Sequence, residues 1–188
     1  MTASDSRNVV LTGFMGTGKT TVGRLLAEQL GYEFVDTDQL IEQRHGKVAD
    51  IFRERGEEVF RTIEREVASE LADRRRLVIS TGGRMMLDPL NVTSLSRHGR
   101  IFCLVANPDA IFERLAGDPS QSERPLLSGP DPRRRIVELL AERAPGYRRF
   151  AQIDTDGVGP AAVANELAAL VRADPNGGAP ADPGGVVQ

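Results

Sequence analysis

Apolar residues near the start of the chain follow two periods, one typical of a strand and one typical of a helix. The run from Asn8 to Thr12 is short and apolar, as expected for a buried strand. Helical spacing then relates four further apolar residues, Val22, Leu25, Leu26 and Leu30. Because Gly31 ends this pattern, the segment predicts a strand, a glycine-rich loop and a helix in that order.

Four more short apolar runs follow, and each is succeeded by a segment with helical spacing. They predict strands over Glu33 to Val35, Leu77 to Ser80, Arg100 to Val105 and Ala151 to Asp154. The stretch between the second and third strands, which includes Glu57 to Ala72, is mostly helical in pattern. Strands that alternate with helices predict an α/β fold of three layers, in which helices cover both faces of a five-stranded parallel sheet.

The length of 188 residues fits a single domain, which we place at residues 1–173. Within it, Gly117 to Pro132 is rich in Gly, Pro, Ser and Asp, which indicates a surface loop or a mobile lid. The segment 174–188 contains many glycines and prolines and few apolar residues. We therefore expect this tail to be disordered and to take no part in catalysis.

Charge and cysteine content limit the partners and the compartment. With 24 basic and 27 acidic residues the net charge is −3, which predicts no partnership with nucleic acid or with an anionic membrane. Cys103 is the one cysteine and lies in an apolar run, so we expect a buried thiol in a reducing compartment. With no signal peptide, membrane span or apolar docking stripe, the pattern predicts a cytoplasmic monomer.

The segment from Gly13 to Thr20 matches the phosphate-binding pattern G-x-x-x-x-G-K-[ST], between a predicted strand and a predicted helix. Its glycines let backbone N–H groups point toward phosphate, while Lys19 supplies positive charge to the β and γ phosphates. The hydroxyl of Thr20 is a ligand for Mg²⁺. The motif predicts a site for ATP with Mg²⁺ at Gly13, Met15, Gly16, Thr17, Gly18, Lys19, Thr20 and Thr21.

Two aspartates close the second predicted strand, which we expect to lie beside the strand that leads into the phosphate-binding loop. The carboxyl ends of parallel strands face the ligand crevice, and residues two apart on a strand point the same way. Asp36 and Asp38 can then face one pocket, one toward the metal and the other toward an acceptor hydroxyl. Alternatively, Asp36-Thr37-Asp38 caps a helix over Gln39 to Glu42, and the two roles are compatible.

Nucleotide binding alone leaves the phosphate acceptor open between water, a protein and a small molecule. The chain has no Asn/Thr-Lys-x-Asp sequence for reading guanine, and its length leaves little room for the switch segments of a GTPase. It also lacks a run of four apolar residues ending in Asp, the usual second ligand of the metal; the third strand ends in Ser80 instead. These features favour a small-molecule kinase.

An ordered set of motifs between Asn8 and Leu170 resembles the shikimate kinase family, which phosphorylates the 3-hydroxyl of shikimate with MgATP. Besides the glycine-rich loop, the set comprises Asp36-Thr37-Asp38, Ile51-Phe52, Gly56-Glu57, Phe60-Arg61 with Glu64, Gly82-Gly83, Arg124-Pro125-Leu126-Leu127, and Arg143-Ala144 with Tyr147-Arg148. The resemblance implies a P-loop kinase fold with substrate-binding helices at about residues 37–72 and a lid at about 117–132. It also implies a role in the route to chorismate and aromatic amino acids.

The resemblance implies a role for individual residues as well. Asp38 holds the acceptor hydroxyls, and Asp36 lies near the metal and the reacting phosphate. Arg61 and Arg143 bind the substrate carboxylate, although from the residues alone both would be read as surface charges. Glu64, three residues after Arg61, can orient its guanidinium. The remaining implied contacts are Gly82 and Gly83 with the acceptor, Arg124 of the lid with the phosphates, and Arg114 with the adenine.

The sequence departs from the family at Arg84, where a third glycine is usual after Gly82-Gly83. The side chain can point away from the pocket, add a contact to an anionic acceptor, or occupy part of the pocket and change the substrate. One alternative function is therefore a kinase for another hydroxy acid such as gluconate. A separate alternative is a nucleotide-binding module that has kept the phosphate-binding loop without catalysis.

Overall fold

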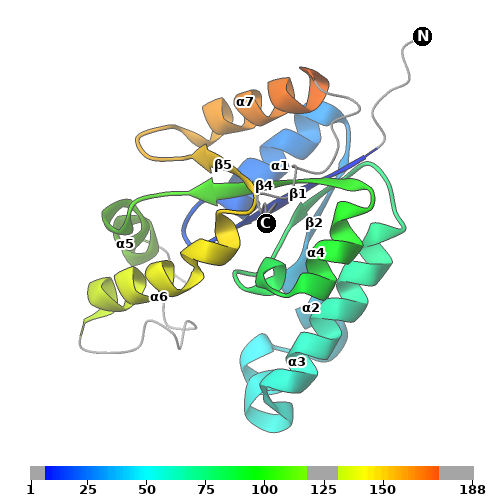
Figure 1. Ribbon diagram of the computed structural model, residues 1–188, viewed down its shortest axis with the longest axis vertical. Coiled ribbons are helices and arrows are strands. Elements are labelled where there is room, and N and C mark those ends of the chain that lie inside the picture. Colours follow the sequence, from blue (N-terminus) through cyan, green and yellow to red (C-terminus); the bar gives the residue numbers. More distant parts are fainter. Residues whose placement is uncertain (1–6, 118–130, 174–188) are drawn as a thin grey trace, which may run out of the picture.

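The computed structural model describes residues 7–117 and 131–173. Five strands form one sheet in the order β2-β3-β1-β4-β5, and every neighbouring pair is parallel (Figure 1). The strands are β1 Asn8–Gly13, β2 Glu33–Asp36, β3 Leu77–Ser80, β4 Gly99–Val105 and β5 Ala151–Asp154. The predicted parallel sheet is confirmed, and each predicted strand agrees with the observed one to within a residue at either end.

Each strand is followed by at least one helix, as the alternating pattern predicts. They are α1 Lys19–Leu30, α2 Thr37–His45, α3 Val48–Ala72, α4 Pro89–Ser96, α5 Pro108–Ala116, α6 Pro132–Tyr147 and α7 Pro160–Ala173, with a 3₁₀ helix, η1, at Met85–Leu87. Helix α1 ends where expected, because Gly31 adopts a left-handed conformation (φ 64°) and its N–H returns to the last turn.

Alternate residues of the central strand face opposite layers of the fold. Val9 and Leu11 of β1 belong to a core that α1 and α7 cover, whereas Val10 belongs to a second core on the other face. Helices α2 to α6 cover this face and contribute apolar side chains to the second core. The three-layer α/β/α fold is therefore confirmed, and β1 and β3 in the middle of the sheet are buried on both faces (Figure 1).

One expectation about strand order is wrong. The sequence analysis places the strand that ends in Asp36 beside the strand of the phosphate-binding loop, but β3 lies between them. Residues Val78 to Ser80 of β3 pair with β1 on one side, and Leu77 to Ser80 pair with β2 on the other. The consequence for the site is that Ser80, at the end of β3, joins Thr20 and Asp36 in one cluster of oxygen atoms.

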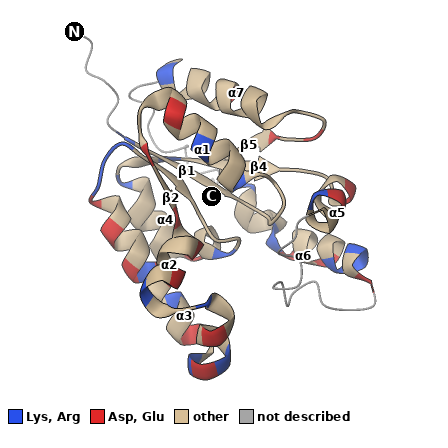
Figure 2. Cartoon of the chain, turned by 180° about the vertical axis from the view of Figure 1, so that it is seen from behind, with Lys and Arg blue, Asp and Glu red and all other residues tan. Residues whose placement is uncertain are grey.

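The helical segment after β2 contains a break that the sequence analysis does not predict. Gly56 (φ 83°, ψ 168°) is not helical, and α3 is kinked there. Lys and Arg residues mix with Asp and Glu residues around the end of α3 that projects from the sheet (Figure 2). Arg53 pairs there with Asp50 at 2.7 Å and with Glu54 at 2.9 Å.

Two predicted segments lie mainly or wholly outside the described residues. The lid at 117–132 falls almost entirely within 118–130, and with it the lid residue Arg124. The predicted disordered tail, 174–188, is the other segment. Among the described residues, no helix combines the length and the apolar composition needed to cross a membrane.

Candidate active site

The phosphate-binding loop joins β1 to α1 in a conformation that depends on its glycines. Gly13, Gly16 and Gly18 all have positive φ angles, of 131°, 77° and 93°. A Cβ on Gly13 would lie 2.3 Å from the carbonyl oxygen of Leu104, so a side chain there collides with the backbone of β4. The glycines therefore hold the loop tight against the sheet and leave the first N–H groups of α1 open to an anion.

Lys19 and Thr20 begin α1 and present their polar atoms at this loop. The Lys19 ammonium donates to the carbonyl oxygens of Gly13 at 3.0 Å and Phe14 at 2.9 Å. The Thr20 hydroxyl donates to Asp36 Oδ2 at 2.9 Å and lies 3.5 Å from the hydroxyl of Ser80. A positive charge and a cluster of oxygen ligands thus adjoin the loop, as the motif predicts.

Asp36 and Asp38 meet at the site by a geometry other than the predicted one. They do not alternate along one strand, because β2 ends at Asp36 and α2 begins at Thr37. Asp36 is the N-cap of α2, and its Oδ1 accepts the N–H groups of Asp38 at 3.1 Å and Gln39 at 3.3 Å. The capping alternative is confirmed, and the second carboxylate oxygen of Asp36 is the one that receives Thr20.

Asp38 has a higher pKa than an ordinary aspartate. Its pKa is raised from 3.8 to about 6, chiefly because the surrounding protein desolvates the carboxylate, although the residue remains open to the cavity. The like charge of Asp36 raises the pKa further, while Lys19 and Arg61 lower it. A carboxyl group with a pKa near the working pH is suited to accept a proton.

A cavity of about 720 Å³ opens along the loop. Of the predicted nucleotide contacts, Met15, Gly16, Thr17, Gly18, Lys19, Thr20, Thr21 and Arg114 line it, together with Asp36, Asp38, Ser80 and Gly83. Arg114 also joins the loop to the end of β5, since it donates to Gly16 O at 3.3 Å and to Thr155 O at 2.6 Å. The sequence analysis misses Thr155, Val158 and Pro160 in the lining, because nothing in their local pattern marks them.

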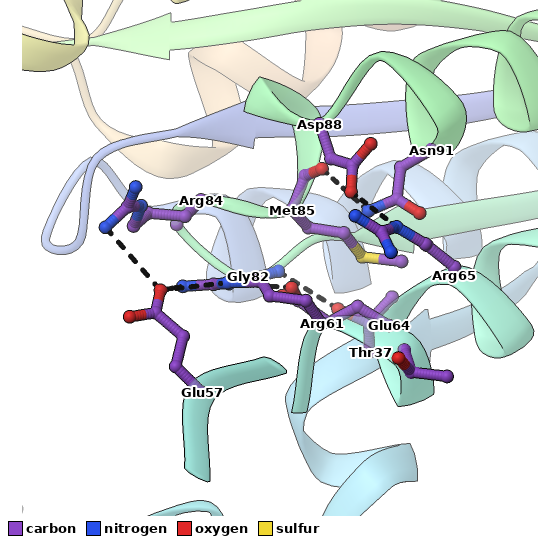
Figure 3. A network of polar contacts seen from close by, with 12 residues as sticks. Thr37, Glu57, Arg61, Glu64, Arg65, Gly82, Arg84, Met85, Asp88 and Asn91 are labelled. Carbon is purple, nitrogen blue, oxygen red and sulfur yellow. Dashed lines mark hydrogen bonds and ion pairs between the residues drawn. The ribbon is translucent and has the colours of Figure 1, made fainter. Parts of the chain in front are cut away.

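The Gly82-Gly83 segment approaches Asp38 at Gly82 and Arg143 at Gly83, and the first approach leaves no room for a side chain, whereas the second is an ordinary van der Waals distance. A Cβ on Gly82 would lie 2.5 Å from Asp38 Oδ1, and one on Gly83 would lie 3.5 Å from Arg143 Nη1. Two contacts fix this segment. Thr37 Oγ1 accepts the N–H of Gly82 at 3.0 Å (Figure 3). The Tyr147 hydroxyl donates to Gly83 O. Burial raises the pKa of Tyr147 to about 12, so this donor keeps its proton.

We predict that Thr37→Val destabilises the fold without removing any contact to a ligand. Thr37 is fully buried, and valine fills the same space but leaves the buried N–H of Gly82 without its acceptor. Such a loss costs about 1–3 kcal/mol. Urea denaturation measures the change, with the exposed Thr62→Val of α3 as the control, for which we expect a change within about 0.5 kcal/mol. Equal stability of the two variants would contradict the prediction.

Arg61 is held by acidic residues on both edges of its guanidinium. Its Nη1 donates to Glu64 Oε2 at 2.6 Å, and its Nη2 and Nε donate to Glu57 Oε1 at 2.9 and 3.2 Å (Figure 3). Burial raises the pKa of Glu64, an effect that the charge of Arg61 opposes. The predicted contact between Arg61 and Glu64 is confirmed, and Glu57 is an additional partner that the sequence analysis does not assign.

Arg143 is buried, and its guanidinium carbon lies 5.2 Å from the centroid of the Phe14 ring. Within residues 7–117 and 131–173, its buried Nε has no hydrogen-bond partner. An unpaired buried donor on a cation is costly, and an anionic ligand would relieve that cost. Arg61, Gly82 and Arg143 lie outside the lining of the nucleotide cavity, next to Asp38 and Gly83.

The oxygen atoms of Thr20, Asp36 and Ser80 are chemically suited to Mg²⁺, which prefers hard oxygen ligands. In the described part of the chain, no group of three or more His, Cys, Asp and Glu side chains could hold a metal by itself. This arrangement fits an ion that takes most of its ligands from water and nucleotide phosphates.

The sheet order and the loop geometry define a class of protein. A glycine-rich loop after the central strand, a lysine at the start of α1 and carboxylates across the same cavity are the parts with which P-loop kinases transfer phosphate. The chain is a member of this class. Within the class, a family model described as shikimate kinase matches residues 15–172, and the chain belongs to that family.

Individual relatives agree with this assignment. A shikimate kinase of Thermodesulfovibrio yellowstonii is 45% identical over 164 residues, which cover 86% of this chain and 92% of the relative. The solved structure of a shikimate kinase from Acinetobacter baumannii, in complex with shikimate, has a TM-score of 0.83 and 36% identity, with 91% and 96% of the two chains covered.

A gluconokinase from Sinorhizobium meliloti 1021 is a more distant neighbour. Its TM-score is 0.51 at 19% identity, with 92% of this chain and 99% of the gluconokinase covered. A similarity at this level concerns the fold alone. The comparisons thus favour shikimate over gluconate among the acceptors that the sequence leaves open.

Proposed function

We propose that this protein transfers the γ-phosphate of ATP to the 3-hydroxyl of shikimate, which yields shikimate 3-phosphate and ADP on the route to chorismate and aromatic amino acids. The observation that carries the proposal is that the phosphate-binding part of the site and the part assigned to the acceptor meet at Asp38. The phosphate-binding loop and Asp38 share one cavity, and the Gly82-Gly83 segment connects Asp38 with the buried cation of Arg143. Membership of the shikimate kinase family supports the same acceptor.

On the phosphate side, the loop N–H groups and Lys19 would hold the triphosphate of ATP. The ammonium already lies at the loop, 2.9 Å from the carbonyl oxygen of Phe14, so a small movement brings it to phosphate oxygens. Thr20 and Asp36 would hold Mg²⁺, which neutralises charge on the phosphates when it is bound. Arg114 would lie against the adenine, and Arg124 of the predicted lid would contact the phosphates; Arg124 is outside the described residues.

On the acceptor side, Arg61 and Arg143 would bind the carboxylate of shikimate, since a planar guanidinium matches a carboxylate in geometry and charge. Asp38 would hold the reacting hydroxyl, and the N–H of Gly83 would add a further donor. The hydroxyl oxygen then attacks the γ-phosphorus as the bond to the β–γ bridging oxygen breaks, ADP leaves, and Asp38 accepts the hydroxyl proton. Positioning and charge stabilisation supply most of the rate in such a reaction.

The test is the release of ADP from MgATP in the presence of shikimate or of gluconate. We expect release with shikimate and none above background with gluconate. Release with gluconate alone would show that gluconate is the acceptor and that Arg84 contributes to the change of substrate. Tight binding of MgATP without release by any acceptor would instead support the module without catalysis.

We also propose that the protein acts as a monomer in the cytoplasm. The free thiol of Cys103 is buried in β4, where burial raises its pKa to about 12, so it needs no oxidising compartment. The exposed large apolar side chains of the described residues are scattered over α4, α6, the β5–α7 connection and α7, with no shared docking stripe, which supports the monomer: Leu90, Val137, Val158 and Leu170.

A further inference from the structure

Arg84, the residue that departs from the family, occupies a backbone conformation that needs no glycine. Its φ and ψ are −111° and −8°, which any residue adopts at little cost. The side chain is 45% exposed and is directed to α3, where Nη1 lies 3.8 Å from Glu57 Oε1 (Figure 3). Arg84 does not line the cavity. The arginine is thus compatible with the acceptor segment and interacts with an acidic side chain beside it.

The same Glu57 oxygen also receives Arg61. Glu57 Oε1 accepts from Nη2 and Nε of Arg61, and thereby occupies one whole edge of that guanidinium. The other edge bonds to Glu64, whose side chain is 2% exposed and tightly packed. Glu57 and Glu64 use three of the five N–H donors of Arg61, so a ligand carboxylate that pairs with the Nε–Nη2 edge competes with Glu57.

Of the two carboxylates that bind Arg61, that of Glu57 is the one that can move away. Its side chain is 55% exposed at the surface of α3, so it can turn away without disrupting the core. Its pKa is held below the ordinary value, first by the hydrogen bond from Arg61 and also by the charge of Arg84, so it remains a carboxylate. If Glu57 moved away from Arg61 and met no other cation, its negative charge would repel the incoming carboxylate of the ligand.

We propose that Arg84 is a positioning residue that takes over the Glu57 carboxylate when the acceptor carboxylate binds Arg61. Closure of the remaining gap converts the 3.8 Å contact into a direct ion pair, and the outer edge of Arg61 is opened to the ligand. Arg84 in this way favours anionic acceptors without contacting them. The inference rests on the proposed function, in which Arg61 binds the carboxylate of shikimate.

A double-mutant cycle with shikimate tests the inference, measured as KM and kcat at saturating MgATP and low salt. We expect Arg84→Ala to raise the KM for shikimate about three- to fivefold, the upper part of the range for an exposed ion pair, with kcat unchanged. In the Glu57→Gln background the same substitution should have no effect, because the neutral amide needs no new partner. Arg84→Lys should have a KM close to that of the wild type, because lysine retains the positive charge.

Two controls separate this inference from its premise. Arg53→Ala removes another exposed, ion-paired arginine near the tip of α3 and should leave KM unchanged. Arg61→Ala should raise the KM for shikimate by more than tenfold, as expected for a lost charge-assisted contact.

Four outcomes overturn the inference. No release of ADP with shikimate overturns the proposed function as well, and an unchanged KM in Arg61→Ala overturns the role that it gives to Arg61. A raised KM in Arg61→Ala together with an unchanged KM in Arg84→Ala overturns only the role of Arg84. An equal effect of Arg84→Ala with and without Glu57→Gln shows that Arg84 does not act through Glu57.

Discussion

Replacement of Lys19 by methionine is expected to lower kcat for shikimate phosphorylation by about 10²- to 10³-fold, as does the loss of one preorganised donor to transition-state charge. Methionine preserves the length of the side chain but removes the ammonium that lies within 3.0 Å of the loop carbonyls. The charge is needed most as electrons move onto the leaving phosphate oxygen, so the effect on kcat should exceed the effect on the affinity for ATP.

The chain offers a matched control for Lys19→Met, because it has one other lysine. Lys47 is exposed before α3 and lies outside the cavity lining, so Lys47→Met should retain wild-type kcat. Single-turnover measurements with saturating ATP distinguish slow chemistry from weak binding. A kcat for Lys19→Met near that of Lys47→Met would show that the ammonium does not assist phosphoryl transfer.

The phosphate-binding loop could be predicted closely because its requirements are local. A strand, glycines with positive φ and a helix that begins at Lys19 all follow within one short segment. Helix α1 likewise ends at Gly31 as predicted, for a conformational reason that lies in that residue itself. Local features of this kind can be predicted from the sequence without knowledge of the rest of the fold.

The contacts that hold the Gly82-Gly83 segment in place could not be predicted in the same way. Gly82 depends on Thr37, which is 45 positions away, and Gly83 depends on Tyr147, which is 64 positions away. Neither pair has a sequence pattern, since a single hydroxyl becomes an acceptor or donor only once strands and helices are assembled. The error in strand order has the same origin, because periodicity identifies a strand but not its neighbours.

Arg84 shows how a departure from a family pattern is resolved by its surroundings. From the sequence, three outcomes for its side chain are open. The structure directs the guanidinium to Glu57 and leaves the backbone in an ordinary conformation. The neighbouring glycine that does require its small size is Gly82, because a Cβ there would lie 2.5 Å from Asp38 Oδ1.

Replacement of Asp38 by asparagine is the second large effect that we expect, with kcat lowered by about 10²- to 10³-fold, within the range for loss of a general base. Asparagine is nearly isosteric and can still contact a hydroxyl, but it cannot accept the proton. The affinity for MgATP should change little, because the loop and Lys19 remain. Asp73→Asn, at the exposed end of α3, is the control and should retain activity.

The raised pKa of Asp38 predicts a second readout that does not depend on activity. An acid that titrates near 6 in the folded protein and near 3.8 when unfolded contributes stability below pH 4, which is lost as pH rises through about 6. Wild-type protein should therefore lose free energy of unfolding relative to Asp38→Asn as pH rises from about 4 to about 7. Urea titrations across this range measure the difference between the two proteins. A difference independent of pH would show that Asp38 titrates as an ordinary aspartate, which would remove its suitability as the proton acceptor.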